Sequence, residues 1–198
     1  LIQNDSVAIQ QIEVTATRAK ESTPIAHSDL SRSEIEAQNY GEDIPSLLKN
    51  LPSVVIASES GTGIGSTSFR VRGTDPTRIN VTLNGVPMND AETHSVYWYD
   101  TPDLVSSLGS VQLQRGVGTS TAGTGAFGAS LNMTSAPSAS KFSGRASLSY
   151  GSFNTAKQEI ALSSGLLGGH WAIDGRLSHL SSDGYVERAS SNLSPYMF

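Results

Sequence analysis

One segment of the sequence has the spacing of a nucleotide-binding loop. Residues 123–128 read Gly-Thr-Gly-Ala-Phe-Gly, which matches the G-x-G-x-x-G pattern whose glycines let a backbone approach a pyrophosphate. That chemistry needs a strand before the loop and a helix after it, so that the helix N-terminus faces the phosphates. Residues 129–134 favour a strand instead, and Thr124 stands where the spacing of a phosphate-binding P-loop requires lysine. We therefore expect no bound nucleotide.

The remaining polar residues show no pattern of catalysis or metal binding. The four histidines are far apart and have neither the i, i+4 spacing nor the finger-like spacing of metal ligands. No G-x-S-x-G elbow is present, and nothing places a nucleophile beside a base. We therefore predict no catalytic residue, no metal site, no cofactor and no enzyme activity. The histidines are His27, His94, His170 and His179.

Three arginines, Arg70, Arg72 and Arg115, could take part in another kind of chemistry, the pairing of buried charges. Arg72 and Arg115 each precede a glycine at the end of a predicted strand, where a tight turn would hold the guanidinium beside the backbone. From the residues alone, these are surface arginines or members of buried ion pairs. A buried arginine would need a partner, because an unpaired buried charge costs several kcal/mol.

The overall charge excludes one class of partner. The chain has 13 lysines and arginines against 18 acidic residues, a formal net charge of −5, and its basic residues are scattered. A nucleic-acid surface needs a basic patch or stripe, so we expect no nucleic-acid partner. The absence of cysteine excludes disulfides and thiolate metal sites. No apolar run reaches the roughly 18 to 20 residues of a membrane-spanning helix.

The elements that would position these residues follow two patterns, and the first covers residues 1 to about 137. Residues 1–27 are polar, apart from an alternating segment at 11–17 that is rich in β-branched residues. This segment is either part of a mobile arm or an edge strand of the following domain. Ser31 and Glu34 fit a capping box, which predicts a helix through about Gln38.

A second helix should follow closely. Asp43 as N-cap and Pro45 in the first turn predict its start, and Pro52 predicts its end. Its apolar residues fall on one face, as expected for a helix that packs on a core. They are Ile44, Leu47, Leu48 and Leu51.

Short strands and tight turns come next. We predict a buried strand at 54–56, strands at 68–72 and 79–83, and a hairpin at Asn84-Gly85, since both residues tolerate positive φ. A short helix should begin at Thr101 and end at Gly109. Strands are expected at 111–114 and 131–134, and residues 136–138 mark a boundary.

The second pattern is strict alternation of apolar and polar residues in three segments after about Phe142. Each segment is roughly ten residues long, the length of a tilted membrane strand. One face could meet lipid and the other water, although a soluble meander with one wet face fits the same pattern. Tyr150 and Trp171 fall where interfacial aromatic residues are expected. A fourth strand should begin at Pro195. So few strands cannot close a barrel, and we expect a fraction of a longer protein.

Several blocks between Phe69 and Asn132 resemble, in order and spacing, the plug domain of TonB-dependent outer-membrane receptors. They are Phe-Arg-Val-Arg-Gly at 69–73, Leu-Asn-Gly-Val at 83–86, Gln-Arg-Gly at 114–116 and the run at 125–132. Residues 42–54 form a further plug-like block. The resemblance implies an α+β plug domain, a mixed small sheet with short helices, followed by the start of an antiparallel transmembrane β-barrel. It divides the chain into an arm at 1–27, a plug at 28–137 and barrel strands at 138–198.

The resemblance also implies roles for particular residues. Segment 11–17 looks like a TonB box, which would add a strand to the sheet of the TonB C-terminal domain. Three plug arginines would pair with acidic groups on the barrel wall and latch the plug, with partners beyond Phe198. Two loops would face the ligand, unless their aromatic residues only pack the loops. The TonB-box residues are Ile12, Glu13, Val14, Thr15 and Ala16; the latch residues are Arg70, Arg72 and Arg115; the ligand-facing residues are His94, Tyr97, Trp98 and Tyr99, together with residues 61–66.

A receptor of this kind would import a scarce nutrient across the outer membrane of a Gram-negative cell, with the plug gating the barrel lumen. The plug and arm would face the periplasm, and outer-membrane lipid would surround the barrel. A ferric siderophore or other metal chelate is the first choice of ligand, and a surface lipoprotein is a further conceivable partner. The alternative is a soluble or surface β-rich ligand-binding module without transport activity.

Overall fold

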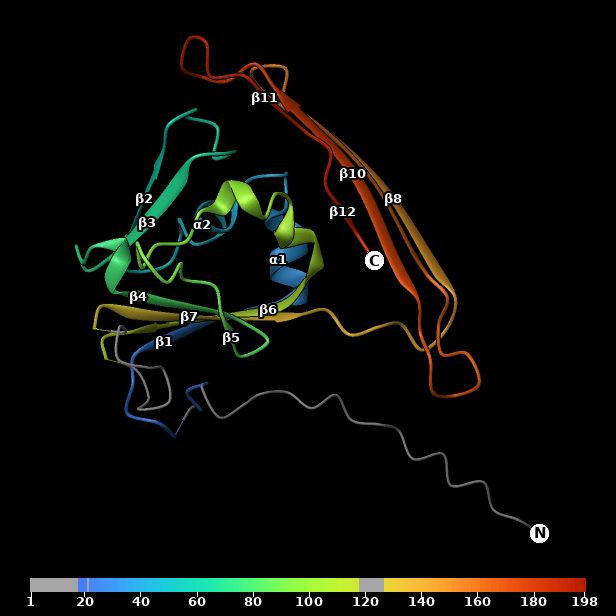
Figure 1. Ribbon diagram of the computed structural model, residues 1–198, viewed down its shortest axis with the longest axis horizontal. Helices are drawn as coiled ribbons and strands as arrows, with labels where there is room; N and C mark the ends of the chain where they lie inside the picture. The colour runs from blue at the N-terminus through green and yellow to red at the C-terminus, as the bar shows by residue number, and fades with distance from the viewer. Residues whose placement is uncertain (1–17, 21, 118–126) are drawn as a thin grey trace.

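A mixed five-stranded sheet forms the base of the first part of the chain, which we call the α+β unit, and the helices lie on one side of it (Figure 1). The computed structural model describes residues 18–20, 22–117 and 127–198. Strands β4 and β7 run parallel, whereas the other neighbouring pairs are antiparallel. The predicted mixed sheet is thus confirmed. Its strands lie in the order β1 (His27–Ser31), β6 (Leu108–Arg115), β7 (Ala129–Ser135), β4 (Ile79–Leu83) and β5 (Val86–Pro87).

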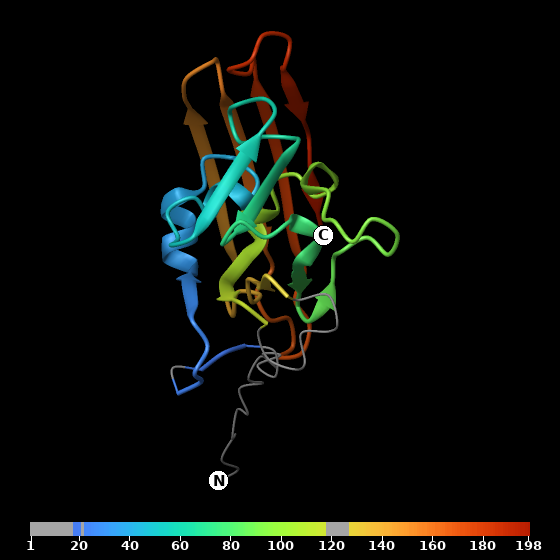
Figure 2. The ribbon, with the colours of Figure 1, turned by 90° about the vertical axis from the view of Figure 1, so that its left-hand side faces the viewer.

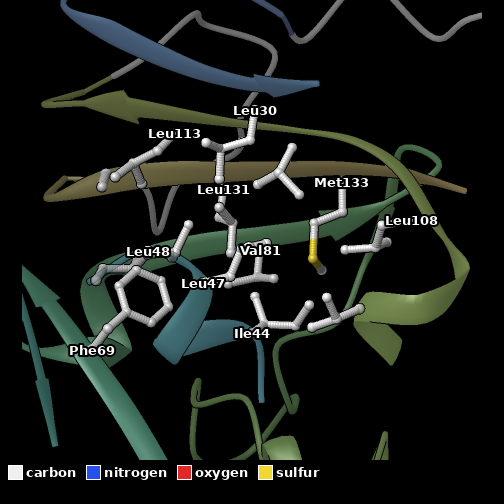
Figure 3. Close-up of a cluster of buried hydrophobic side chains, with 14 of the residues drawn as sticks. Leu30, Ile44, Leu47, Leu48, Phe69, Val81, Leu108, Leu113, Leu131 and Met133 are labelled. Atoms are coloured by element: carbon white, nitrogen blue, oxygen red, sulfur yellow. The ribbon is translucent and has the colours of Figure 1, made fainter. Parts of the chain in front are cut away.

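One face of this sheet carries the hydrophobic core. Val111 and Leu113 alternate with polar residues along β6, so both point to the same side. Leu131 and Met133 on β7 and Val81 on β4 lie beside them, and all five are at most 2% exposed. Figure 3 shows side chains from the second helix and from β3 covering this layer. Each such burial contributes about 1.5–3 kcal/mol, so the apolar face fixes which way the sheet is turned.

Two short helices cover the apolar face of the sheet. Helix α1 (Arg32–Gln38) begins with the predicted capping box, in which Ser31 N donates to Glu34 Oε2 over 2.8 Å. Helix α2 (Ile44–Leu47) begins where predicted but ends four residues earlier than expected. The chain continues to Leu51 in turns, with Leu51 N donating to Leu48 O.

A separate hairpin packs over the core. Strands β2 (Val54–Ser58) and β3 (Thr67–Val71) pair with each other alone among the described strands. The prediction that residues 54–56 are buried was wrong in part, because Val55 is 65% exposed.

The hairpin of Asn84 and Gly85 is confirmed, with φ of 51° and 80°. A short 3-10 helix, η2 (Pro76–Arg78), precedes β4.

Two further 3-10 turns follow, η3 (Trp98–Asp100) and η4 (Leu104–Ser107). Only η4 falls within the helix predicted between Thr101 and Gly109, and it replaces that helix. The N-cap of η4 is Asp103 rather than Thr101, and it adopts the left-handed conformation with φ 55° and ψ 25°. Strand β6 then begins at Leu108, inside the predicted helix, because Leu108 completes the core layer at 0% exposure.

The second part of the chain is a separate antiparallel sheet, which we call the C-terminal sheet. It consists of β8 (Ser143–Tyr150), β9 (Ala156–Ser163) and β10 (Asp174–Ser182), with β11 (Ser191–Leu193) and β12 (Tyr196–Met197) both paired to β10. Figures 1 and 2 show it running along one side of the α+β unit.

The fourth strand begins earlier than predicted. Leu180 lies opposite Leu193 and Leu177 lies opposite Tyr196, so β11 and β12 share one register. They form a single strand interrupted at Pro195, which has no N–H to donate to a sheet. The strand therefore starts at Ser191 and not at Pro195.

The predicted alternation separates two faces of the C-terminal sheet. Lys157, Glu159 and Arg176 face the α+β unit and are at most 6% exposed. Leu148 and Leu162 point the other way and are 82% and 56% exposed. Trp171 lies outside β10, in an isolated bridge with Leu167. No helix in the described ranges is long and apolar enough to cross a membrane.

Candidate functional site

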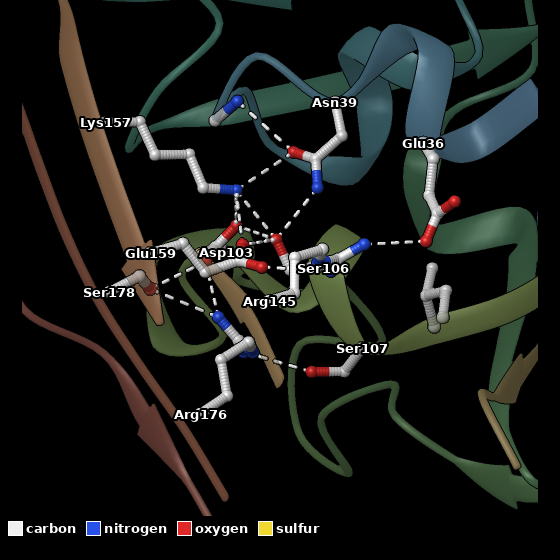
Figure 4. A network of polar contacts seen from close by, with 12 residues as sticks. Glu36, Asn39, Asp103, Ser106, Ser107, Arg145, Lys157, Glu159, Arg176 and Ser178 are labelled. Carbon is white, nitrogen blue, oxygen red and sulfur yellow. Dashed lines mark hydrogen bonds and ion pairs between the residues drawn. The ribbon is translucent and has the colours of Figure 1, made fainter. Parts of the chain in front are cut away.

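A buried group of charged side chains joins the α+β unit to the C-terminal sheet. We call it the Asp103 cluster; its members are Asp103, Ser106, Lys157, Glu159 and Arg176 (Figure 4). Lys157 and Glu159 are two residues apart on β9, so their side chains share a face. Arg176 comes from β10, in register with Ala161. The first two members come from the turn around η4.

Asp103 lies at the centre of the cluster. Lys157 Nζ donates to its Oδ1 over 2.6 Å, and Arg176 Nη1 and Ser178 Oγ donate to its Oδ2. Its side chain is fully buried. Asp and Asn adopt the left-handed conformation more readily than other residues with a Cβ. An aspartate at position 103 therefore supplies both the turn geometry and the negative charge.

Ser106 connects the two buried carboxylates. Its Oγ lies 2.6 Å from Asp103 Oδ1 and 2.8 Å from Glu159 Oε2, and its single proton can be donated to either one. Lys157 Nζ and Asn39 Nδ2 donate to the same Oγ over 2.7 and 2.8 Å. The hydroxyl thereby holds side chains from the α+β unit and from the C-terminal sheet in one place.

The charges of the cluster balance. Lys157 and Arg176 oppose Asp103 and Glu159, and Lys157 Nζ is 3.2 Å from Glu159 Oε2. Buried ion pairs are held in one geometry because each charge left unpaired would cost several kcal/mol. The only nitrogen of the cluster without a hydrogen bond among the described residues is Arg176 Nε. Arg176 also lines a cavity of about 550 Å³ between the two sheets.

Helix α1 adds a more exposed extension to this cluster. Arg145 Nη1 is 2.7 Å from Glu36 Oε1, and Arg145 Nη2 is 2.9 Å from Glu159 Oε1. Arg145 and Glu36 are 41% and 43% exposed, and exposed pairs of this kind contribute about 0–1 kcal/mol. Asn39 Oδ1 also accepts from Lys157 Nζ. The extension therefore orients α1 against the C-terminal sheet, while the buried cluster supplies the attachment.

A second contact joins the two parts at the tip of the β2–β3 hairpin. Tyr185 N and Val186 N both donate to Ser60 O, over 2.9 and 3.2 Å. Gly61, with φ 72°, lies so close to the Tyr185 ring that a Cβ there would be 2.8 Å from it. Phe153 stacks edge-on against Tyr185 at 5.4 Å between ring centroids. The α+β unit is thus fixed to the C-terminal sheet at two separated places.

The three predicted latch arginines lie away from these contacts. Arg70 forms an exposed ion pair with Asp75 at 3.5 Å. Arg115 Nε donates to Pro52 O over 2.9 Å. Burial lowers the pKa of Arg115, and the nearby charge of Arg72 lowers it further. Within the described part of the chain, neither Arg72 nor Arg115 forms an ion pair. Their pairing with more distant acids stays a prediction.

The predicted ligand-facing residues are divided between the core and the surface. Trp98 is 3% exposed and packs against Phe69 at 6.2 Å between ring centroids. Tyr97 and Tyr99 are exposed and lie 5.6 Å apart. His94 is exposed and has a φ of 57°. The three aromatic residues line a cavity of about 380 Å³ beside the β2–β3 hairpin. Residues 61–66 lie at the tip of that hairpin and do not all line this cavity.

The predicted TonB-box residues, Ile12 to Ala16, lie outside the described residues. Arg18 is the first described residue, and its Nη2 donates to Thr134 Oγ1 over 2.8 Å. Ala19 N donates to Gln112 Oε1, and Gln112 Nε2 donates to Ala19 O, over 2.8 and 2.9 Å. The side chain of Gln112 thus pairs with the Ala19 backbone as a neighbouring strand would. This anchor lies inside the predicted arm at 1–27 and fixes the chain shortly after the predicted TonB-box residues.

The glycine-rich segment does not have the setting of a nucleotide site. Residues 123–126 lie outside the described residues, and Gly128 leads directly into β7, a strand. Gly128 has no room for a side chain, because a Cβ would be 2.6 Å from Thr74. No group of three or more metal-binding side chains is found in the described ranges.

Sequence reasoning missed the Asp103 cluster. Asp103 appeared only as part of a helix start, and its partners lie more than 50 residues further along the chain. A signal was present in the alternating segments, where Lys157, Glu159 and Arg176 share the polar face of strands with an apolar other face. Charges on the inner face of such strands indicate a charged partner.

Comparison with known proteins identifies the architecture. The TonB-dependent Receptor Plug Domain family matches residues 19–130, whereas no curated protein sequence matches. The ferripyoverdine receptor of the Pseudomonas aeruginosa outer membrane is similar with a TM-score of 0.66 and 17% identity, over 85% of this chain and 22% of that chain. The alcaligin outer-membrane receptor FauA of Bordetella pertussis has a TM-score of 0.63 and 19% identity, over 83% and 28%.

A third similar structure is the siderophore receptor PirA of Acinetobacter baumannii, with a TM-score of 0.58 and 17% identity, over 79% of this chain and 24% of that chain. At these identities the structures show the fold. The chain spans between 22% and 28% of the length of these three proteins. Since the family match covers more than half of the sequence, the chain belongs to the TonB-dependent receptor plug domain family.

Proposed function

We propose that this chain forms the N-terminal arm, the plug and the first wall strands of a TonB-dependent outer-membrane receptor that imports a scarce nutrient. The arm would comprise residues 1–27, the plug residues 28–137 and the barrel strands residues 138–198. The role is transport, without catalysis and without a resident cofactor. One observation carries the proposal, namely the two-faced character of the C-terminal sheet that holds the plug.

The outer face of that sheet supports a position in the membrane. Large apolar side chains on this face are exposed in succession along neighbouring strands, whereas soluble proteins rarely expose such a patch. Tyr150 at the end of β8 is 77% exposed, in the place of an interfacial aromatic residue. The exposed apolar residues of the three strands are Leu148, Ile160, Leu162 and Leu177.

The inner face supports a plug held inside a lumen. Lys157 and Arg176 point inward and pair with Asp103 of the plug. A charged, hydrogen-bonded contact can be separated into two surfaces that water solvates, whereas an apolar contact would expose hydrophobic area on opening. A gate that must leave and return is therefore better built from polar contacts. The latch of Arg70, Arg72 and Arg115 would add to this attachment through acids elsewhere on the wall.

The arm provides the point of energy coupling. Ile12 to Ala16 would add a strand to the sheet edge of the TonB C-terminal domain. The anchor of Ala19 on Gln112 lies directly behind this segment, so a pull on the arm would reach the plug sheet there. The proposal also includes a surface lipoprotein as a further partner, on the other side of the membrane.

The ligand is proposed to be a ferric siderophore or another metal chelate. Three of the structural relatives are described as receptors for ferripyoverdine, alcaligin and ferric yersiniabactin. In this chain, Tyr97 and Tyr99 are exposed beside a cavity on the plug, and aromatic faces suit an amphipathic ligand.

Membrane fractionation combined with uptake tests the proposal. The full-length protein should sediment with the outer membrane, should need detergent for extraction, and should take up a radioactive ferric chelate only when TonB is present. A matched pair of arm variants, Val14→Pro and Val14→Thr, distinguishes the role of the backbone from that of the side chain. A full-length product that is soluble, or uptake that is unaffected by loss of TonB, would overturn the proposal.

A further inference from the structure

The cavity beside the β2–β3 hairpin has an unusual set of lining groups. Tyr97 and Tyr99 offer aromatic surface, and the strands opposite offer hydroxyl groups from Ser58, Thr67 and Ser68. Among the described residues that line it, Glu59 is the only charged side chain, and there is no lysine, arginine or histidine. The cavity therefore has hydrogen-bonding groups and aromatic faces, but no positive charge to attract an anion.

The sequence around the cavity is also poor in positively charged residues. No lysine or arginine occurs between Lys49 and Arg70, or between Arg78 and Arg115. These two stretches contain β2, most of β3 and the whole aromatic loop, so they supply nearly every residue that lines the cavity. The acidic residues in them are Glu59, Asp90, Glu92, Asp100 and Asp103.

Two groups of the aromatic loop have shifted pKa values. Hydrogen bonds from Thr93 lower the pKa of Asp90 below its usual value. Desolvation, followed by the charge of Asp100, raises the pKa of the Tyr99 phenol, which therefore stays neutral and able to donate a hydrogen bond. Arg70 and Arg78 each lie two residues along the chain from a lining residue, and Arg70 is paired with Asp75.

We propose that this cavity binds a ligand group without net negative charge, and that it selects uncharged or cationic metal chelates over polyanionic ones. The inference rests on the proposed function and narrows its substrate class. Polyanionic chelates would bring several negative charges toward Glu59, and none of the described residues that line the cavity carries a positive charge to offset them. An uncharged chelate loses nothing to this repulsion and gains stacking on the two tyrosines and hydrogen bonds to the hydroxyl groups.

The test compares two ferric chelates of similar size on the purified full-length protein. One is an uncharged ferric tris-hydroxamate and the other a trianionic ferric tris-catecholate, each carrying radioactive iron so that binding is measured directly. We expect the uncharged chelate to bind at least tenfold more tightly at low ionic strength. The difference in affinity between the two chelates should become smaller as salt is added. Salt screens the repulsion by the carboxylate, because the Debye length falls from about 30 Å at 0.01 M to about 8 Å at 0.15 M.

Substitutions locate the effect in the cavity. Glu59→Gln should strengthen binding of the trianionic chelate by roughly 3- to 20-fold at low salt, as expected for three charges about 7 Å from a carboxylate in water, and should leave the uncharged chelate within about twofold. Glu34→Gln is the matched control, because glutamine also fits the capping box of α1. Tyr97→Ala should weaken binding of the uncharged chelate, whereas Tyr97→Phe should retain most of it.

Each result decides between the alternatives. Equal or tighter binding of the trianionic chelate, or a Glu59→Gln variant that behaves like Glu34→Gln, would overturn the inferred selectivity. Binding of neither chelate would reject the cavity as a chelate site. The proposed transport role fails on different grounds, namely fractionation and TonB dependence, so the two proposals are judged separately.

Discussion

Replacement of Asp103 by asparagine should weaken the attachment of the plug to the C-terminal sheet by about 3–5 kcal/mol. The carboxylate accepts from Lys157, Arg176 and Ser178 and is fully buried. Removing one partner of a buried charge pair typically has a cost of this size, because the opposite charge remains buried without compensation. Asparagine is nearly isosteric and tolerates the left-handed backbone at this position, so the change isolates the charge.

This loss of stability can be measured by urea titration of the plug in the full-length protein. Trp98 is buried against Phe69 in the plug core. Its fluorescence can be isolated by subtracting the spectrum of a Trp98→Phe variant. With a slope of about 1.5 kcal/mol per M for a domain of this size, the midpoint should fall by about 2 to 3 M. Asp100→Asn serves as control, because this carboxylate is exposed and lies three residues earlier in the same loop.

A double-mutant cycle sharpens the test. Lys157→Met combined with Asp103→Asn should destabilise the plug by less than the sum of the two single changes, with a coupling of about 0.5–3 kcal/mol. Strict additivity would refute a direct charge pair between the two residues. If Asp103→Asn shifts the midpoint no more than Asp100→Asn does, the buried cluster does not hold the plug and the reasoning fails.

Three further predictions concern the rest of the plug. Burial raises the pKa of Asp43 to about 6, from an ordinary value of 3.8. The folded state therefore binds the extra proton, so plug stability should fall as pH rises from about 4 to about 6 and then level off; Asp43→Asn should remove this slope in urea titrations. Val14→Pro should abolish TonB-dependent uptake without loss of chelate binding, because proline donates no ladder hydrogen bond, while Val14→Thr should transport normally. Arg115→Ala should ease release of the plug by about 1.5–3 kcal/mol, the usual worth of hydrogen bonds from a charged donor, and unchanged plug retention and uptake would contradict a latch role.

Local signals in the sequence were sufficient for many elements of the fold. The capping box at Ser31 and the Asn84-Gly85 turn depend on residues within a few positions of each other, and both are confirmed. The alternating segments also predicted the strands of the C-terminal sheet, because a strand with one buried face must repeat every two residues. The family resemblance, carried by residues 69–132, is confirmed by the match to the plug domain family.

Tertiary contacts decided the rest, and local pattern could not reveal them. Asp43 fits an N-cap, yet its carboxylate accepts from Thr67 on β3 instead. Trp98 is followed by Tyr99 in a polar loop, but only Trp98 turns inward to the core. The Asp103 cluster combines residues of the turn around η4 with residues of the C-terminal sheet, and a single sequence does not show which charges meet.

The connectivity of the plug sheet has a consequence for the order in which the protein forms. His27 on β1 pairs with Gln114 on β6, so the first plug strand can pair only with a strand that lies far along the chain. Pairings between distant segments form slowly, because a long loop must be closed before contacts are gained. Strands β8, β9 and β10 pair with their immediate neighbours along the chain. We therefore expect the surface that presents Lys157 to be assembled before the sheet next to Asp103 is complete, which gives the folding plug a template against which to dock.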